Sequence, residues 1–196
     1  MSGITSLPPD LQQRLLQELK SGEQLVWVAQ PNADRAMKSG FKIWFFFLPW
    51  TAFSVFWICG ASGFKMPSFD SGFGWFPLFG LPFLLIGLGG LCSPLWLKRK
   101  ALTTIYAITN QRALTIKGKK TFTIKSYLPA DLATLEKTVH QDGSGDLILW
   151  TEHYHDSDGD KQKRTEGFSD IENVRHVEKL LESLAQSPAA PARSVF

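Results

Sequence analysis

The first forty residues carry a short helical pattern followed by a short strand. Three leucines recur at helical spacing after Pro9: Leu11, Leu15 and Leu19. Gly22 ends this helix, and residues 24–29 form an apolar strand. The apolar stripe of the helix is narrow and its charges balance, so we expect it to pack on a folded domain rather than lie on a membrane. Residues 1–40 therefore form an N-terminal helix and a first strand.

Two long apolar stretches follow, and they predict a pair of transmembrane helices. No charged side chain occurs from Ile43 to Phe64 or from Ser71 to Leu97. Each stretch exceeds the roughly 20 residues that a helix needs to cross a bilayer. Buried helices of a soluble protein are the alternative, but they rarely lack charge on every face over such a length. We expect a transmembrane hairpin over 41–97, with spans at about 43–60 and 77–97.

The second apolar stretch is rich in residues that shape helices. Its prolines, Pro77, Pro82 and Pro94, suit helix starts or a kink. Its glycines would let the bulky rings of the first stretch approach closely; they are Gly80, Gly87, Gly89 and Gly90. Cys59 and Cys92 are expected far apart along this helix pair, beyond disulfide reach.

Charges beside the apolar stretches predict their orientation. Positive side chains flank the hairpin on both sides: Arg35, Lys38 and Lys42 before it, Lys98, Arg99 and Lys100 after it. The connecting loop carries only Lys65 and Asp70. Because positive residues remain on the cytoplasmic side, both termini are expected in the cytoplasm. A signal peptide is not expected, since the first apolar run follows a polar segment with a pattern of its own.

Beyond the hairpin the period changes to two, which is typical of strands. Leu114, Ile116, Phe122 and Ile124 face one way, whereas Thr115, Lys117, Thr123 and Lys125 face the other. Tight turns join these segments as antiparallel hairpins, and the meander continues to about residue 168. Together with the strand at 24–29, the pattern predicts seven strands.

A closing helix follows the strands. Ser169 and Glu172 have the spacing of a capping box. The apolar stripe of the helix comprises Val174, Val177, Leu181 and Leu184. The folded domain thus spans 98–186, and the proline- and alanine-rich tail 187–196 is expected to be disordered. The predicted fold class is α+β.

One segment resembles a known family. YAITNQRAL, residues 106–114, is similar to the Y-x-(I/L)-T-x-x-R hairpin of bacterial pleckstrin-homology (bPH-like) domains, with Tyr106, Thr109 and Arg112 at the motif positions. The GEQLVWVAQP segment before a helical hairpin resembles the start of membrane-anchored members. The resemblance implies a pleckstrin-homology-like antiparallel β-barrel with a C-terminal helix that binds or assembles rather than catalyses. It also implies residence in the bacterial inner (cytoplasmic) membrane as a multi-pass protein.

Charge is unevenly distributed along the chain. Residues 98–130 contain eight cationic side chains and no acid: Lys98, Arg99, Lys100, Arg112, Lys117, Lys119, Lys120 and Lys125. Each such cation near an anionic leaflet contributes roughly 1 kcal/mol of attraction. These residues are candidates for contact with lipid headgroups or a protein partner, and the alternative is a topology signal plus a solvated strand face. Residues 131–196 are acidic, which is compatible with self-association into a homo-oligomer.

Motifs for catalysis, cofactors or metals are not found. The chain lacks a GxSxG elbow, a phosphate-binding glycine loop and an HExxH pair. His153 and His155 precede an Asp-rich turn, but that turn lacks the glycine and glutamate positions of a calcium loop, and zinc would need further ligands. We therefore expect no enzyme activity, no cofactor and no metal site. Nucleic-acid binding is also not expected, because stacking rings are missing from the basic strands.

The sequence favours a membrane-anchored scaffold. In this interpretation the hairpin tethers a cytoplasmic binding domain and raises its local concentration near anionic lipids or a partner. The alternative is an oligomeric pore or transport-accessory subunit, with the domain as its regulator. The spans contain no Asp, Glu, Lys, Arg or His, which are the usual side chains of a conduction path.

Overall fold

The computed structural model describes residues 7–64, 76–119, 121–133, 135–155, 159 and 161–186. The chain divides into two compact units. One, the two-sheet domain, comprises residues 1–32 and 100–196, and the other, the helical hairpin, comprises residues 33–99. The fold class is α+β, as predicted. The expected tail 187–196 lies outside the described residues.

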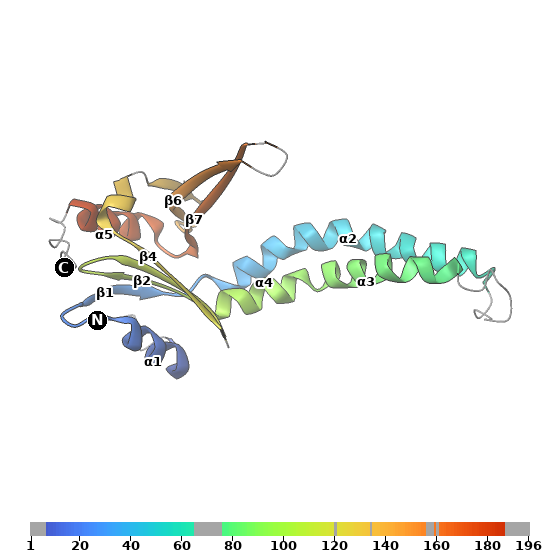
Figure 1. The fold of residues 1–196 in the computed structure, drawn as a ribbon, viewed down its shortest axis with the longest axis horizontal. Coiled ribbons are helices and arrows are strands. Elements are labelled where there is room, and N and C mark those ends of the chain that lie inside the picture. The colour runs from blue at the N-terminus through green and yellow to red at the C-terminus, as the bar shows by residue number, and fades with distance from the viewer. Residues whose placement is uncertain are drawn as a thin grey trace. The chain divides into compact units, whose positions relative to one another are not determined.

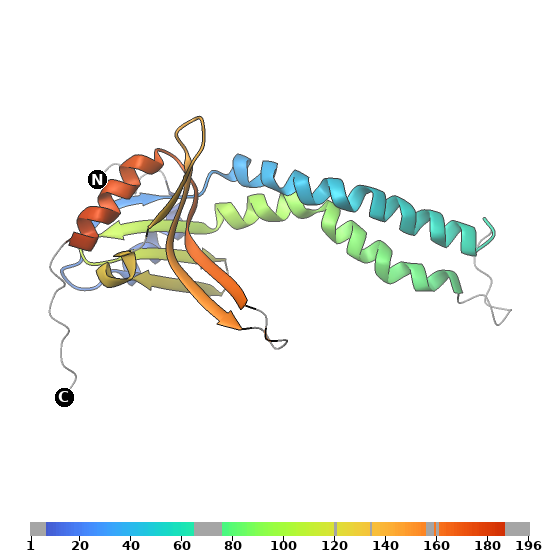
Figure 2. The same ribbon diagram turned by 90° about the horizontal axis from the view of Figure 1, so that it is seen from above.

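The described residues of the two-sheet domain form seven strands. The first sheet has the order β1 (Leu25–Ala29), β2 (Thr104–Thr109), β3 (Ala113–Gly118) and β4 (Phe122–Tyr127). The second has the order β5 (Glu136–Val139), β6 (Gly145–His155) and β7 (Lys161–Ile171). All neighbouring strands are antiparallel. Figure 2 shows β6 and β7 as a long, twisted pair.

The expected closed barrel is not formed by the described strands, which remain in two separate sheets. After β4 the chain enters a 3₁₀ helix, η3 (Pro129–Ala133), instead of turning back into a strand beside β4. Pro129 has no N–H to donate to a strand ladder, so the regular pairing ends there. The 3₁₀ turn then carries the chain to the second sheet.

The two faces of the first sheet bury different residues. Helix α1 (Pro9–Glu18) covers one face with Leu11 and Leu15, as expected from the narrow stripe. Leu114 and Ile116 of β3 lie beneath it, which confirms the predicted alternation of this strand. In Figure 1 the sheet lies between α1 on one side and α5 (Val174–Gln186) on the other.

The main core lies on the other face of the first sheet. Tyr106 and Tyr127 from this face meet Phe168 of β7 and the apolar stripe of α5. The rings of Tyr106 and Phe168 stack with centroids 4.6 Å apart. The predicted stripe of α5 is confirmed, because Val174, Val177, Leu181 and Leu184 are all buried.

The predicted capping box is wrong, because α5 begins at Val174 rather than after Ser169. Ser169 and Asp170 remain in β7, where their N–H groups donate to the Tyr106 hydroxyl and to the Asp146 carboxylate. These long-range hydrogen bonds extend β7 past Ser169, where the capping-box pattern predicted the start of the helix. Asn173, at φ 52°, then accepts the first helical hydrogen bonds.

The chain passes between the two units twice, once after β1 and once before β2. Both of these points are at the same end of the first sheet. The Gln30 side chain, just after β1, donates to the Leu102 carbonyl at 2.9 Å. Thr104, the first residue of β2, pairs with Lys117 near the end of β3. The Gly118 N–H donates to the Thr103 carbonyl at 3.1 Å. The β3–β4 turn is therefore at this end, whereas the Asn110 turn is at the opposite end.

The helical hairpin begins with the long helix α2 (Ala33–Ala61), which contains the first predicted span. The second stretch is not one straight helix. It comprises η2 (Phe76–Phe79), α3 (Gly80–Leu91) and α4 (Ser93–Leu102), with a 47° bend between α3 and α4. Pro94 cannot donate to the preceding turn, which explains the break. By length and composition one helix could span a membrane, or two if the bent pair is counted as one span.

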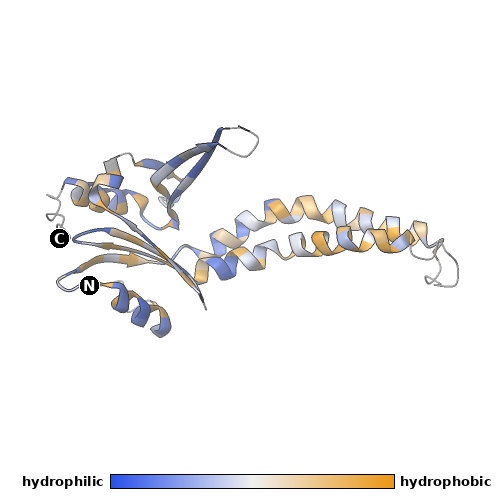
Figure 3. Ribbon diagram, viewed as in Figure 1, coloured by the Kyte–Doolittle hydropathy of each residue, from blue (hydrophilic) through white to orange (hydrophobic). Residues whose placement is uncertain are grey.

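Glycines of α3 lie against side chains of α2, as the small-residue pattern predicts. A Cβ added to Gly90 would lie 2.1 Å from the Phe47 ring, and one added to Gly87 would lie 2.4 Å from the Thr51 hydroxyl. Gly89 instead meets nothing within 4 Å. Figure 3 shows that apolar residues dominate this helix pair. Cys59 and Cys92 are free thiols, as expected.

Candidate functional site

The hairpin presents large aromatic side chains to its surroundings. On α2, Phe45 is 71% exposed, Phe53 63% and Phe56 66%. A core helix of a soluble protein would bury these rings, because each buried Phe is worth roughly 1.5–3 kcal/mol. The described hairpin therefore carries an extended apolar surface that its own residues do not cover.

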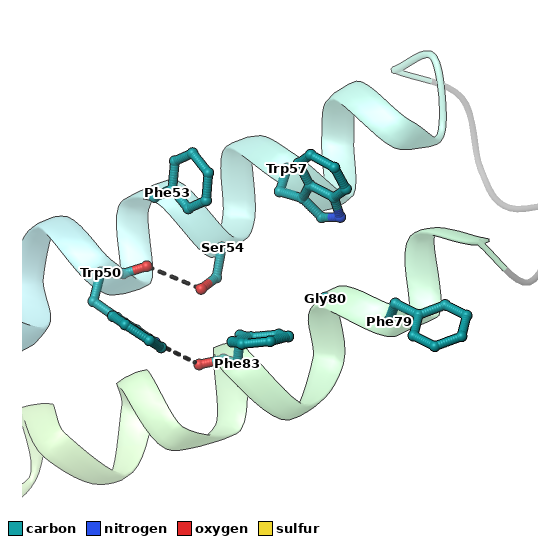
Figure 4. A pocket seen from close by; sticks show the side chains of 7 residues that line it. All are labelled: Trp50, Phe53, Ser54, Trp57, Phe79, Gly80 and Phe83. Atoms are coloured by element: carbon teal, nitrogen blue, oxygen red, sulfur yellow. Dashed lines mark hydrogen bonds between the residues drawn. The ribbon is translucent and has the colours of Figure 1, made fainter.

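A groove of about 350 Å³ lies between α2 and α3 (Figure 4). Its walls come from α2, η2 and α3: Trp50, Phe53, Ser54, Trp57, Phe79, Gly80 and Phe83. The Trp50 indole N–H donates to the Phe83 carbonyl at 3.1 Å, and the Ser54 hydroxyl donates to the Trp50 carbonyl at 2.9 Å. The polar hydrogens of these two side chains are thus already hydrogen-bonded to backbone carbonyls. The walls therefore offer mainly apolar contacts, which suit a hydrocarbon chain rather than a polar solute.

The predicted cationic residues occupy three different environments. Lys98 in α4 pairs with Asp34 of α2 at 2.9 Å, within the hairpin. Lys100 and Lys119 are exposed in the two-sheet domain, and Arg99 is exposed on α4. Lys120 lies outside the described residues. The remaining three, Arg112, Lys117 and Lys125, are at least partly buried.

Arg112 is a structural residue, and its side chain is not available at the surface. Its guanidinium donates to both carboxylate oxygens of Glu23, at 2.8 and 3.0 Å. It also donates to the Ser126 hydroxyl and to the Glu18 carbonyl, both at 2.8 Å. Arg112 thereby joins the end of α1 to strand β4. Four of the five N–H groups of its buried guanidinium donate to these acceptors, which counts against the expectation that Arg112 contacts lipid or a partner.

Glu23 is the buried partner that sequence inspection missed. Burial alone raises the pKa of this carboxyl, but hydrogen bonds from Arg112, the Lys20 N–H and the Thr109 hydroxyl outweigh it. The pKa of Glu23 falls to about 2. The sequence offered one signal for this pair. An acid, Glu23, stands just before an apolar strand, and an arginine, Arg112, stands in a predicted turn.

The other motif residues are also structural. The Thr109 hydroxyl lies 2.8 Å from a Glu23 oxygen and accepts hydrogen bonds from the N–H groups of Gln111 and Arg112. These contacts close the tight turn between β2 and β3. Tyr106 accepts a hydrogen bond from the Ser169 N–H at 3.1 Å and joins the two sheets. The motif therefore specifies a turn and a sheet contact.

Lys117 and Lys125 are partly buried, and both lie near Glu166 of the second sheet. Lys125 forms an ion pair with Glu166 of β7, whose carboxylate also pairs with Arg164 at 3.2 Å. The Tyr127 hydroxyl lies 3.4 Å from the same carboxylate. We call this group, Lys117, Lys125, Tyr127, Arg164 and Glu166, the intersheet cluster. It borders a cleft of about 260 Å³ that Trp150 also lines.

The electrostatics of the intersheet cluster follow from cations gathered around one acid. Burial lowers the pKa of Lys117, and the nearby charges of Lys100, Lys125 and Arg164 lower it further against the opposing effect of Glu166. Burial raises the pKa of Glu166, but Lys125 and Arg164 lower it by more. The cluster itself holds three cations and one acid, whereas the lining of the adjoining cleft holds two acids, Asp131 and Glu166, and one cation, Lys125.

The sequence shows that Thr and Lys alternate along β3 and β4. It does not show which acid pairs with these lysines. Glu166 lies far along the chain in a strand with charges of both signs, so no local spacing connects it to Lys125. Likewise, the Asp-rich turn after His155 lies mostly outside the described residues, so the structure does not address that group.

Comparisons with known protein families, with curated proteins and with solved structures found no match to this chain.

Proposed function

We propose that this protein is a membrane-anchored binding protein. The helical hairpin inserts into a lipid bilayer, and the two-sheet domain contacts anionic lipid headgroups at the cytoplasmic face. The proposed location is a bacterial inner membrane, with both termini cytoplasmic. The proposal combines the exposed apolar surface of the hairpin with the basic residues of the domain.

The exposed rings of α2 are the observation that carries the proposal. Phe45, Phe53 and Phe56, each about two-thirds exposed, would together gain roughly 3–6 kcal/mol on transfer from water to hydrocarbon. In water this surface would promote aggregation, whereas the hydrocarbon of a bilayer would solvate it. The groove between α2 and α3, with its apolar walls, supports the same environment.

Charges flanking the apolar stretches support the orientation. Asp34 and Lys98 form an ion pair at the base of the hairpin, next to Arg35 and Arg99 in the chain. Such a cationic cluster is retained on the cytoplasmic side during insertion. The two crossings leave the first sheet at one end, which suits a domain that stays on one side of the bilayer.

We further propose that the two-sheet domain is a pleckstrin-homology-like sandwich. Sheets of four and three antiparallel strands, followed by one amphipathic helix, support this assignment. The Tyr106–Arg112 segment supports it as well, because its hydrogen bonds hold a turn and a sheet contact together.

The topology of the first sheet favours one set of lysines for headgroup contact. Lys117 and Lys119 lie at the sheet end where the chain enters β2, close to Lys100. Lys100 itself follows the second apolar stretch by three residues. We therefore propose Lys100 and Lys119, which are exposed, as the headgroup contacts.

Chemical labelling of lysines tests the headgroup contact on the full chain. The protein is reconstituted into nanodiscs that contain either zwitterionic lipid alone or a mixture with anionic lipid, and amine modification is followed by mass spectrometry. Labelling of Lys100 and Lys119 should slow severalfold in the anionic discs. Lys179, exposed on α5, is the internal control and should not change. Equal rates for all lysines in both discs would contradict the headgroup contact.

Carbonate extraction and cysteine accessibility test the anchor separately. Cys59 and Cys92 are replaced by serine, and a single cysteine is placed at Ser71, between the two apolar stretches, or at Ser187, after α5. An impermeant maleimide should label the first site in intact spheroplasts and the second only after lysis. Release of the chain by carbonate would overturn the anchor and the proposal built on it.

The pore alternative gains no support from the described hairpin. Helix α2 carries no Asp, Glu, Lys, Arg or His from Ile43 to Ala61, and the described groove is lined by apolar groups. A water-filled path needs polar groups that replace the hydration of its solute.

A further inference from the structure

Strand β4 forms an open edge of the first sheet. In the order β1-β2-β3-β4, it pairs with β3 only. Among the described residues, no backbone hydrogen bond reaches β4 from its other side. An unpaired edge presents a row of backbone N–H and C=O groups to which another extended chain can bind.

The alternation of hydrogen bonds identifies the outward groups of β4. The Gly118 N–H donates to the Thr103 carbonyl, so the backbone groups of Gly118 are directed to the β2 side of β3. Gly118 lies opposite Phe122, and this pair is therefore not hydrogen-bonded. Hydrogen-bonded and non-hydrogen-bonded pairs alternate along antiparallel strands. The N–H and C=O groups of Phe122, Ile124 and Ser126 consequently point away from β3.

The other sheet edges are less open to a partner strand. The Asn32 N–H, just after β1, donates to the Asp170 carbonyl in β7 at 2.9 Å, so these two edges meet each other. Strand β5 has only four residues, and its Lys137 forms an ion pair with Glu178 of α5. Short and charged edge strands resist pairing. Among the described strands, β4 therefore offers the most suitable edge.

The cleft of about 260 Å³ beside the intersheet cluster adjoins this edge. Three consecutive residues of β4 line it together with residues of η3, β6 and β7: Lys125, Ser126, Tyr127, Asp131, Trp150 and Glu166. The Asp131 carboxylate accepts a hydrogen bond from the Leu128 N–H and has no ion pair among the described residues. Two acids and one cation favour an added positive charge, and the half-exposed Trp150 ring can hold a guanidinium by cation–π contact.

We propose that β4 binds an extended peptide segment of another protein as an antiparallel strand. Side chains of such a strand alternate between its two faces. An apolar residue of the peptide lies beside Ile124, whose side chain is 38% exposed on the α1 face of the sheet. An arginine three positions away lies beside Tyr127, over the cleft. The residue beside Lys125 is uncharged, because a cation there would face a like charge.

A second copy of the chain is a less suitable occupant. Antiparallel pairing of two β4 edges would place the two ends at which the chain passes to the helical hairpin on opposite sides of the joined sheet. Hairpins that enter one bilayer need these ends on the same side. This choice of occupant rests on the proposed membrane anchor, whereas the open edge and the cleft do not depend on it. Lys100 and Lys119 are not part of the surface.

Peptide titration of the full chain in detergent tests the proposal. The probe is the capped, fluorescein-labelled peptide RVTVTV, and its binding is followed by fluorescence anisotropy. It should bind saturably, and EVTVTV should bind at least about tenfold more weakly, because its acid would meet Asp131 and Glu166. N-methylation of the valines should abolish binding, since their N–H groups face β4. N-methylation of the threonines should leave it unchanged.

Variants of β4 and η3 test the same contact from the protein side. Ile124→Pro removes one outward N–H without loss of a hydrogen bond to β3, as edge strands allow, and should weaken RVTVTV binding roughly tenfold. Ile124→Val is the matched control and should bind like the unaltered chain. Asp131→Asn keeps the acceptor for the Leu128 N–H but removes the charge, and should weaken binding severalfold. Hydrogen exchange of β2 and β3 verifies that each variant is folded.

Three results would overturn the proposal. The first is equal binding of RVTVTV and EVTVTV, and the second is equal affinity of Ile124→Pro and Ile124→Val for RVTVTV. The third is a dimer that Ile124→Pro dissociates in sedimentation while RVTVTV does not bind, which would assign the edge to a second copy. Carbonate extraction reports on the anchor alone, so failure of the anchor is distinguishable from failure of peptide binding.

Discussion

Removal of the Arg112 guanidinium should destabilise the two-sheet domain more than any other single charge change. Arg112→Met keeps the length of the side chain but leaves the Glu23 carboxylate buried without its main partner. The side chain of Glu23 has no exposed surface, and that of Arg112 is 10% exposed. The variant therefore leaves an uncompensated charge inside the domain, and water cannot replace the lost hydrogen bonds.

The size of the effect follows from the pair itself. Breaking a buried ion pair on one side costs about 3–5 kcal/mol. The pKa of Glu23, lowered from 4.5 to about 2, corresponds independently to about 3 kcal/mol of stabilisation of its charged form. Because this pKa is depressed in the folded state, the contribution is complete above about pH 4.5. It is lost as the pH falls toward 2.

Hydrogen exchange followed by mass spectrometry measures the effect in the full chain in detergent. The free energy of opening should fall by about 3–5 kcal/mol for peptides of β2 and β3 in Arg112→Met. Arg14→Met is the matched control, because the Arg14 guanidinium lies over the Phe122 ring at 3.6 Å on the surface helix α1. That change should cost no more than about 1 kcal/mol. Glu23→Leu combined with Arg112→Met should recover part of the loss, since an apolar pair leaves no charge buried.

Acid titration of Arg112→Met provides a second check, because the stability of this variant should change with pH in the opposite direction to that of the unaltered chain. Without Arg112, burial should raise the pKa of Glu23 above its unfolded value. Arg112→Met should then gain stability as the pH falls from 7 toward 4, whereas the unaltered chain should not. A loss below 1 kcal/mol for Arg112→Met, or a double variant whose loss equals the sum of the two single losses, would refute this account of the pair.

Two further predictions concern the hairpin packing and the cleft. Gly90→Ala should destabilise the α2–α3 contact by about 1–3 kcal/mol in a steric-trapping or denaturation assay, because its Cβ would meet the Phe47 ring. Gly89→Ala, on the open side of the same helix, is the control, and equal losses would contradict the packing. Burial raises the pKa of Tyr127 to about 12, so its stabilisation is complete below about pH 10 and is lost as the pH rises to 12. Tyr127→Phe should therefore lose less stability than the unaltered chain between pH 9 and pH 11.5 in thermal unfolding, and an identical alkaline loss would exclude this residue as the cause.

The Tyr106–Arg112 motif has a structural role that its spacing alone does not reveal. Its spacing indicated a hairpin, and a hairpin is present. Its cationic residue was also expected to contact a ligand, yet Arg112 is buried against Glu23. Spacing along the chain reveals which residues share a strand face or a turn. It does not reveal which residue from a distant segment a side chain will contact. The partner of Arg112 lies some ninety residues away, so the sequence could not identify it.

By itself, the sequence determined the elements whose signal is local. The absence of charge from Ile43 to Phe64, the period of two in β3 and the apolar stripe of α5 each reflect a repeat of the backbone, and each predicted its element correctly. Tertiary structure alone decided how the strands divide into two sheets, where α5 begins and which charges are paired. Those features depend on contacts between distant segments, such as Lys125 with Glu166 and Ser169 with Tyr106, whose energies exceed the local preferences of the residues involved.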